Sequence, residues 1–361
     1  MNISSDFKGL KVQVTNGGIM RRRLNLWKGF RLCLISVTFL TLFTMFDGGN
    51  VVLDTWDWFL FNLVQSFARP IVILNSSSPR AHHSQALPYP YPYRFLINQP
   101  KKCQGRSPFL VLLVMGQNHD VQGRDTIRTT WGNVTNYGDV DVVRIFLVGV
   151  SPIMTGAIQR LLEEESAIYG DIVQQDFLDT YNNLTLKTLM GMEWVAKFCP
   201  NTSYVMKVDN DVFLNVNYLV HKLLRPELPP RRNYLTGLIV YNTGPMRSKD
   251  SKWYLSEEVY PANAYPPYPS GPAYVLSADM ARKIYKVAQD LLVFGIEDVF
   301  VGICLYKLNI LPTQPPRNVF NGEKIDYDPD TFCHVVLVHH YREIDLIKVW
   351  EDFSRRRTFV C

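Results

Sequence analysis

The stretch that decides the fold is Tyr204-Val205-Met206-Lys207-Val208-Asp209-Asn210-Asp211, in which an apolar run ends in two carboxylates. Short apolar runs rich in Val are typical of buried β-strands, so we expect a strand over 203–214 that runs into the acids. Carboxylate oxygens presented in this way suit Mg²⁺ or Mn²⁺. A solvated turn is the alternative, because Asp and Asn are common turn residues.

Further apolar runs lie on both sides of this stretch. Residues 109–115, 142–150 and 171–177 predict three more strands, and helical patterns lie at 125–131, 154–169 and 184–198. Strands that alternate with helices predict an α/β fold with parallel strand pairs. Ligands of such sheets bind beyond the carboxyl ends of the strands, which is where Asp209–Asp211 falls.

The half of the chain after Lys222 is more irregular. We expect helices at 278–290, 296–308 and 344–353, a strand at 334–340, and a Pro/Tyr-rich loop at 260–269. No internal repeat is visible.

The N-terminus predicts a membrane topology. Seven of the chain's basic side chains lie within residues 1–31 against one acid, Asp6, and an apolar run follows at 32–46. A basic flank without a clear cleavage site favours a signal anchor, with 1–31 in the cytosol and the remainder translocated. A cleaved signal peptide and a soluble core helix are the alternatives. The Pro/Ser-rich residues 47–106 predict a stem, and 107–361 a globular lumenal body.

The remaining charge and the sequons agree with this topology. The formal net charge is only +5 and comes mainly from the N-terminal cluster, so no nucleic-acid footprint is expected. Sequons suited to lumenal N-glycosylation begin at Asn75, Asn133, Asn183 and Asn201. The five cysteines after Cys33 would face an oxidising compartment; their spacing fits no zinc pattern and does not fix their connectivity.

Three other groups of residues are candidates for chemistry. Glu297-Asp298 precedes an apolar stretch and is interpreted as either a general base or a helix N-terminus. His339-His340 ends a predicted strand, where a histidine can be a metal ligand or an ordinary core or surface residue. Arg124 and Arg128 share a helical face and could clamp a phosphate or form pairs within an amphipathic helix.

Taken together and in order, these segments resemble one family. Residues 124–131 match R-x-x-I-R-x-T-W, residues 169–188 match the central block, residues 207–215 match the acidic motif and residues 297–302 match E-D-V-x-x-G. The chain from about residue 107 to 361 is similar to the β-1,3-glycosyltransferases, and within them to the β-1,3-galactosyltransferases.

The resemblance implies an α/β fold of the GT-A type and a mixed central sheet. It implies inverting transfer of galactose from UDP-galactose to the 3-hydroxyl of a terminal N-acetylglucosamine, with Mn²⁺ as cofactor and Mg²⁺ as a possible substitute. It also implies a Golgi membrane protein with a single span and a lumenal catalytic domain.

The roles that the resemblance implies fall on named residues of this chain. The base would be Asp298 with Glu297 beside it. The metal ligands would be Asp211, His339 and Asp209, and Asp209 would also face the nucleotide. The expected donor-binding residues are Asp209, Asn210, Arg124, Arg128 and Lys187. The expected disulfides are Cys199–Cys304 and Cys333–Cys361, which leaves Cys103 unpaired.

One segment departs from the family pattern. The family has S-G-x-G-Y where this chain has Ser270-Gly271-Pro272-Ala273-Tyr274, which replaces a glycine and removes a backbone donor. A β-1,3-N-acetylglucosaminyltransferase shares every motif and is the alternative function. An inactive glycan-binding homologue is a second alternative, and a purely structural membrane glycoprotein leaves the ordered motifs unexplained.

Overall fold

The structure is a computed structural model that describes residues 85–87, 89–134, 137, 140–153 and 155–360. The chain divides into two units, Met1–Pro70 and Ile71–Cys361, and all described residues belong to the second. The predicted cytosolic tail, the anchor, residues 47–84 of the stem and the sequon at Asn75 lie outside the described residues. Among the described residues, no helix is long and apolar enough to cross a membrane.

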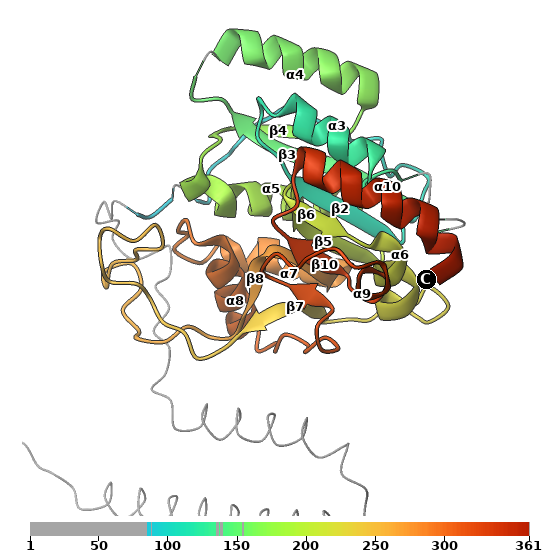
Figure 1. Ribbon diagram of the computed structural model, residues 1–361. Helices are drawn as coiled ribbons and strands as arrows, with labels where there is room; N and C mark the ends of the chain where they lie inside the picture. Colours follow the sequence, from blue (N-terminus) through green and yellow to red (C-terminus); the bar gives the residue numbers. More distant parts are fainter. Residues whose placement is uncertain (1–84, 88, 135–136, 138–139, 154, 361) are drawn as a thin grey trace, which may run out of the picture. The chain divides into compact units, whose positions relative to one another are not determined.

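A mixed sheet forms the centre of the body (Figure 1). Its seven strands are β1 (Phe95–Ile97), β2 (Leu110–Met115), β3 (Val142–Val150), β4 (Ile172–Leu178), β5 (Tyr204–Asp209), β7 (Leu235–Val240) and β8 (Tyr268–Ser277), in the order β1-β4-β3-β2-β5-β8-β7. The pairs β2–β3, β2–β5 and β3–β4 are parallel, and β5–β8 and β7–β8 are antiparallel. The predicted α/β fold with parallel pairs is therefore confirmed.

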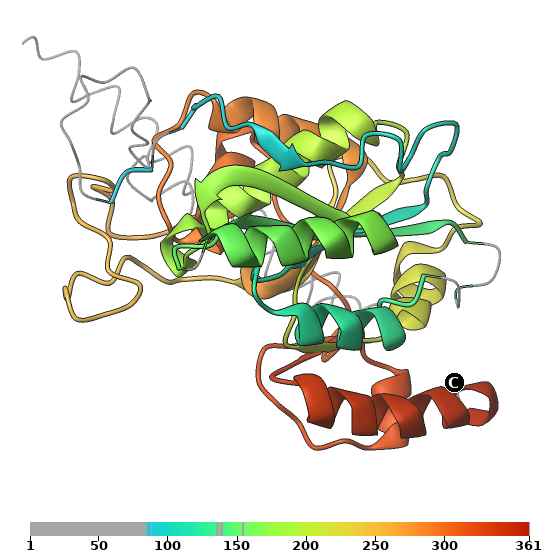
Figure 2. The same ribbon diagram turned by 90° about the horizontal axis from the view of Figure 1, so that it is seen from above.

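The helices cover both faces of this sheet. They are α3 (Val121–Thr129), α4 (Thr155–Tyr169), α5 (Leu184–Phe198), α6 (Val216–Tyr218), α7 (Ala278–Ala288), α8 (Glu297–Lys307), α9 (Pro329–Cys333) and α10 (Glu343–Val360), with a 3₁₀ turn η1 (Tyr181–Asn183) and a π-helical turn η2 (Leu219–Leu224). Successive residues of β2 point to opposite faces. Leu110, Leu112 and Val114 therefore join a core with α3 and α10, whereas Val111 and Leu113 join one with α5, α7 and α8. Figure 2 shows α3 beside α10 on their common face.

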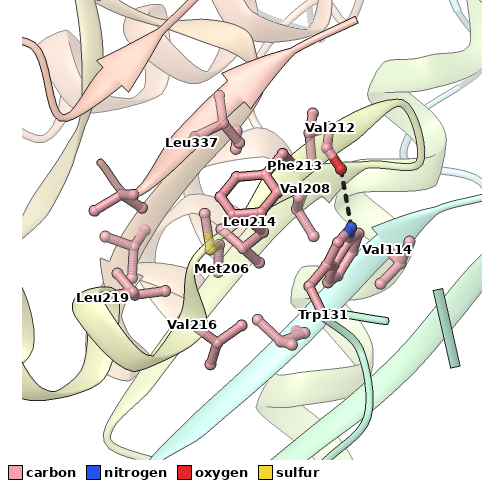
Figure 3. Packing of buried hydrophobic residues seen from close by; sticks show 14 of the residues in the cluster. Val114, Trp131, Met206, Val208, Val212, Phe213, Leu214, Val216, Leu219 and Leu337 are labelled. Carbon is pink, nitrogen blue, oxygen red and sulfur yellow. Dashed lines mark hydrogen bonds between the residues drawn. The ribbon is translucent and has the colours of Figure 1, made fainter. Parts of the chain in front are cut away.

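The strand predicted over 203–214 is in fact two strands. β5 ends at Asp209, and β6 (Val212–Leu214) enters a second sheet of order β6-β10-β9, with β9 (Phe320–Asn321) and β10 (Leu337–His339). Trp131 is fully buried beside β6, and its Nε1 donates to the carbonyl of Val212 at 2.9 Å (Figure 3). This packing fixes the point where the chain leaves one sheet for the other, and the acidic triplet lies there.

The residues just before the predicted body also pack on it. Phe95–Ile97 pairs with β4, and the amide of Gln85 donates to the carbonyl of Tyr254 at 2.7 Å. Tyr93 packs edge-on against Phe177. The stem boundary at residue 106 stays a prediction, although Phe95–Ile97, within the predicted stem, forms a strand of the central sheet.

One expected disulfide is wrong. Cys199, directly after α5, is bonded to Cys103 with a Cα–Cα distance of 5.2 Å, because the segment before β2 passes the end of that helix. Cys304 is instead a free thiol, fully buried within α8, and this burial raises its pKa. Cys333 is disulfide-bonded; its expected partner Cys361 lies outside the described residues.

The described sequons differ in accessibility. Asn201 is exposed, whereas Asn133 and Asn183 are half-buried. The Asn183 amide also donates to the carbonyl of Leu178 at 2.8 Å. N-glycosylation of all three stays a prediction, and Asn201 presents the most open acceptor.

Candidate active site

The acidic triplet lies where the parallel strands end. Asp209 is the last residue of β5 and is in register with Met115, the last residue of β2. Its side chain is about a third exposed, whereas that of Asp211 is only 12% exposed. The predicted position of the triplet at the carboxyl edge of the sheet is confirmed.

A cluster of possible metal ligands surrounds Asp211. One ligand atom each from Asp211, His339 and His340 lies within 4.8 Å of the others. β10 pairs with β6 so that His339 faces Val212, and its Nε2 lies 3.4 Å from a carboxylate oxygen of Asp211. A carbonyl oxygen of Gly322 lies 3.1 Å from the other ring nitrogen, Nδ1, a contact that commonly orients a ligating histidine.

The donor set of this cluster fits a transition metal. Imidazole nitrogen is a common ligand of first-row transition metals and carboxylate oxygen suits Mn²⁺, whereas Mg²⁺ prefers oxygen ligands alone. The structure thus brings Asp211 and His339 together as predicted. It adds His340, whose left-handed backbone (φ 65°) lets its ring stack on His339 with centroids 3.7 Å apart. Asp209 is not in the cluster.

Arg342 is a further cation at this cluster that the sequence did not single out. Its Nη2 donates to Asp211 Oδ2 at 2.7 Å, although the arginine side chain is 69% exposed. Burial alone would raise the pKa of Asp211, but hydrogen bonds from His339 and Arg342 hold it well below its usual range. Asp211 is therefore ionised at neutral pH, as a metal ligand must be.

A buried lysine connects the acidic triplet to α8. Lys207 lies on β5, and its Nζ donates to Asp209 Oδ1 at 2.6 Å and to the carbonyl of Gly271. The same nitrogen lies 3.8 Å from Glu297 Oε2. Truncation of Lys207 would leave several carboxyl groups without their buried counter-ion. Sequence reasoning missed this role, although a lysine inside an apolar strand is a visible signal.

Glu297, the first residue of α8, is held inside the protein. Its Oε1 accepts hydrogen bonds from Thr188 at 3.0 Å and from the Tyr274 hydroxyl at 2.5 Å. Burial raises the pKa of Glu297 to about 7, although the charge of Lys207 opposes this rise. Because its oxygens face the interior, Glu297 positions its neighbours and is not placed to touch a substrate.

Asp298 is the more open member of the pair. It is half-buried, and its Oδ1 accepts from the Val299 N–H at 2.8 Å. Burial raises the pKa of Asp298, and the Val299 N–H and the charge of Lys207 offset this only in part. A carboxylate of raised pKa at a helix N-terminus is a chemically suitable general base.

Asn210 has a structural partner. Its amide donates to Asp120 Oδ2 at 2.9 Å, and Asp120 caps α3 by accepting from the Gly123 N–H at 2.8 Å. This bond ties the middle of the triplet to the start of α3. The contact uses one of the two amide N–H groups of Asn210, so its donor-binding role stays a prediction. Asp120 is a partner that sequence reasoning missed.

Arg124 and Arg128 do not form the predicted phosphate clamp. Both are buried, and Arg124 bonds to Glu165 through Nε at 2.8 Å and Nη2 at 2.5 Å. Arg128 bonds to Asp171 at 3.0 and 2.9 Å and lies 2.7 Å from Glu165. The carboxylates of Glu165 and Asp171 thus bind both guanidinium groups inside the protein. The predicted phosphate clamp is therefore wrong, and the two arginines instead hold α3 against α4 and the start of β4.

This ion network predicts a stability effect. Burial alone would raise the pKa of Asp171, but Arg128 and Arg144 lower it below its usual value. The ionised Asp171 carboxylate therefore stabilises the fold above the pKa of the unfolded state, and this stabilisation is lost as the pH falls through the lower pKa of the folded state. Asp171→Asn leaves buried arginines uncompensated and is expected to lower the free energy of unfolding by about 3–5 kcal/mol. Urea denaturation of both proteins at pH 7 measures this difference in the free energy of unfolding.

The matched control for this prediction is Asp176→Asn. Asp176 pairs with Arg94, whose side chain is 81% exposed, and such surface pairs contribute less than about 1 kcal/mol. Equal losses of stability in the two variants would contradict the assignment of Asp171 to a buried network.

The ammonium group of Lys187 is also bound to other groups of the protein. It is almost fully buried on α5, and its Nζ donates to the Gly116 carbonyl and to Asp179 Oδ1, both at 2.6 Å. Asp179 in turn accepts from the Gly149 N–H at 2.9 Å. Lys187, directly and through Asp179, therefore ties together the carboxyl ends of β2, β3 and β4. This corrects its predicted direct contact with the donor.

The segment that departs from the family pattern lies in β8. Ala273 pairs with Val208 of β5, and the β7–β8 register shifts between Gly237 and Ile239, opposite Pro272. A proline is tolerated at such an irregularity because no ladder donor is required there. The departure thus leaves the sheet intact. Gly271 remains, and a Cβ added there would lie 3.4 Å from Asp298 Oδ2.

These features place the protein in the class of α/β domains that gather acidic ligand-binding groups at the carboxyl ends of parallel strands. The galactosyltransferase family model matches residues 122–316, and the chain belongs to this family. The matched region contains Asp209, Asp211, Glu297 and Asp298, whereas His339 and Arg342 lie beyond it.

Among curated relatives, β-1,3-galactosyltransferase 2 of Mus musculus and of Homo sapiens are each 46% identical over 275 residues, 76% of this chain. The match spans 65% of the length of each of these two relatives. β-1,3-galactosyltransferase 1 of Mus musculus is 42% identical over 274 residues, 75% of this chain and 82% of that protein. A solved WbbM bifunctional glycosyltransferase aligns with 69% of this chain and 52% of its own at 10% identity, with a TM-score of 0.36.

Proposed function

We propose that this chain is an inverting β-1,3-galactosyltransferase that transfers galactose from UDP-galactose to the 3-hydroxyl of a terminal N-acetylglucosamine. One observation carries the proposal. The half-buried Asp298 is joined through Gly271 and the buried Lys207 to the acidic triplet, so a base and a metal-binding motif belong to one connected site.

The proposed division of roles follows from burial. Asp298 is the base, because it is the accessible member of its pair, and Glu297 holds it in place from the interior. Asp211 and His339, with His340 beside them, are the metal ligands, and Asp209 faces the nucleotide. When bound, Mn²⁺ would offset the charge of the departing diphosphate.

The proposed reaction is a direct displacement. Asp298 accepts the proton of the acceptor 3-hydroxyl, whose oxygen bonds to the anomeric carbon of galactose while the bond from that carbon to the diphosphate oxygen breaks. UDP leaves with the bonding electron pair, and the anomeric configuration inverts. Lys207 bonds to both Asp209 and the Gly271 carbonyl and so fixes the distance between them. In this proposal, that positions Asp209 on the nucleotide side of the donor and Asp298, beside Gly271, on the acceptor side.

The proposed location is the Golgi membrane, with residues 32–46 as a signal anchor and the body in the lumen. The basic N-terminal flank, the sequons and the Cys103–Cys199 disulfide support it. The fold is proposed to be of the GT-A type.

The test is a donor comparison with product analysis. Body residues 85–361 are incubated with an acceptor ending in N-acetylglucosamine and with UDP-galactose or UDP-N-acetylglucosamine. NMR then determines the linkage and anomeric configuration. We expect a β-1,3-linked galactose. Transfer from UDP-N-acetylglucosamine alone would support the alternative donor, and transfer from neither would support the inactive glycan-binding homologue.

A further inference from the structure

A basic pocket lies at the end of the sheet opposite the candidate active site. Its volume is about 550 Å³, and its walls come from η2, the loop at 225–234 and the segment at 313–316. The Arg231 N–H donates to the Tyr204 hydroxyl at 2.9 Å. Tyr204 and Asp209 occupy opposite ends of β5, so roughly 17 Å of strand separates this pocket from the triplet. The pocket is therefore distinct from the donor site.

Four cationic side chains line this pocket: Lys222, Arg225, Arg231 and Arg232. Among the residues that the structure describes, none of the four forms an ion pair with a carboxylate. Asp279 accepts a hydrogen bond from the N–H of the lining residue Asn233 at 3.3 Å and is already bound to Lys283 at 3.0 Å. The pocket thus concentrates positive charge without internal compensation, which favours an anionic ligand.

The walls of the pocket are held in place before any ligand binds. The Thr313 N–H donates to the Leu235 carbonyl at 2.7 Å, and Thr236 Oγ1 donates to the Thr313 carbonyl at 2.7 Å. The Arg231 guanidinium lies 4.5 Å from the centre of the Tyr234 ring. Arg225 adopts a left-handed backbone (φ 57°), a conformation that costs free energy for a residue other than glycine and often marks functional sites.

The neutral side chains indicate the kind of anion. Asn233, Thr313 and Gln314 stand among the cations and can exchange hydrogen bonds with hydroxyl groups. Guanidinium groups match the oxygens of sulfate and carboxylate in a bidentate way. We propose that this pocket binds an acidic oligosaccharide, one that carries sulfate or carboxylate groups on sugar rings. The inference does not rest on the proposed transfer activity.

The experiment measures binding of a heparin-derived hexasaccharide to the body by titration calorimetry at 150 mM salt, with its fully desulfated form as comparison. Arg231→Gln/Arg232→Gln removes two charges from the pocket. The control, Lys249→Gln/Lys286→Gln, removes two exposed charges elsewhere. We expect about tenfold or greater loss of affinity in the pocket variant and less than about twofold in the control. Saturating UDP should leave binding unchanged.

Three results would overturn the proposal: no saturable binding, an equal loss in both double variants, or displacement by UDP. The first excludes the site, the second indicates general attraction of a polyanion, and the third places the probe in the donor site. Should Arg231→Gln/Arg232→Gln fold poorly, Lys222→Gln/Arg225→Gln tests the pocket from its other wall with the same expected loss.

Discussion

Asp298→Asn is expected to lower the turnover number by about 10²–10⁴-fold, because an amide cannot accept the proton of the acceptor hydroxyl. The substitution preserves shape, and an asparagine oxygen can still accept from the Val299 N–H. UDP affinity is therefore expected to change by less than about twofold. Initial rates with saturating substrates and calorimetric titration of UDP in the presence of Mn²⁺ measure the two effects separately.

The control for this prediction is Asp290→Asn, the same chemical change at an exposed position after α7. It should leave both rate and affinity unchanged. If the Asp298 variant kept a rate within about threefold of the parent protein, the base would have to be sought elsewhere. Glu297 would be an unsuitable replacement because its carboxyl group faces Thr188 and Tyr274.

Asp211→Asn is expected to weaken Mn²⁺ binding by more than about 100-fold, since it removes the carboxylate at the centre of the ligand cluster. The same substitution frees Arg342 from its 2.7 Å contact, so an uncompensated cation would further repel the metal. Electron paramagnetic resonance of free Mn²⁺ reports the affinity directly and needs no turnover. Circular dichroism verifies that the variant is folded.

Asp250→Asn serves as the matched control because Asp250 is exposed on a loop outside the site, and its Mn²⁺ affinity should equal that of the parent protein. An unchanged affinity in the Asp211 variant would show that the cluster does not hold the metal. Transfer activity should fall together with metal affinity in this variant, whereas the Asp298 variant should lose activity alone.

Local patterns were sufficient to predict the elements on which this site is built. The apolar runs that form β2, β3 and β5 are buried on both faces of the sheet, which makes them continuous in sequence. The acids at 209 and 211 follow such a run directly. The doublet at 339–340 was visible too, but only the turn at His340 shows that the second ring reaches the cluster.

The wrong predictions share a physical cause. Arginines four residues apart on a helix fit a phosphate clamp and a buried ion pair equally well, and their carboxylate partners lie 41 and 43 residues away. The pairing of Cys199 with Cys103 depends on how the segment before β2 crosses the end of α5. β8 was not predicted from the sequence, because Gly271 and Pro272 are uncommon inside strands. Such outcomes are decided by tertiary packing and not by local sequence.

The central claim is that the site around Asp211 and Asp298 transfers a sugar with the help of a metal. Its most direct test is the release of UDP from UDP-galactose by body residues 85–361, followed with and without an acceptor ending in N-acetylglucosamine, and in Mn²⁺ or a chelator. The account predicts rapid release only when Mn²⁺ and the acceptor are both present. Release at an equal rate in the chelator, or no acceptor-dependent release from UDP-galactose, would contradict it.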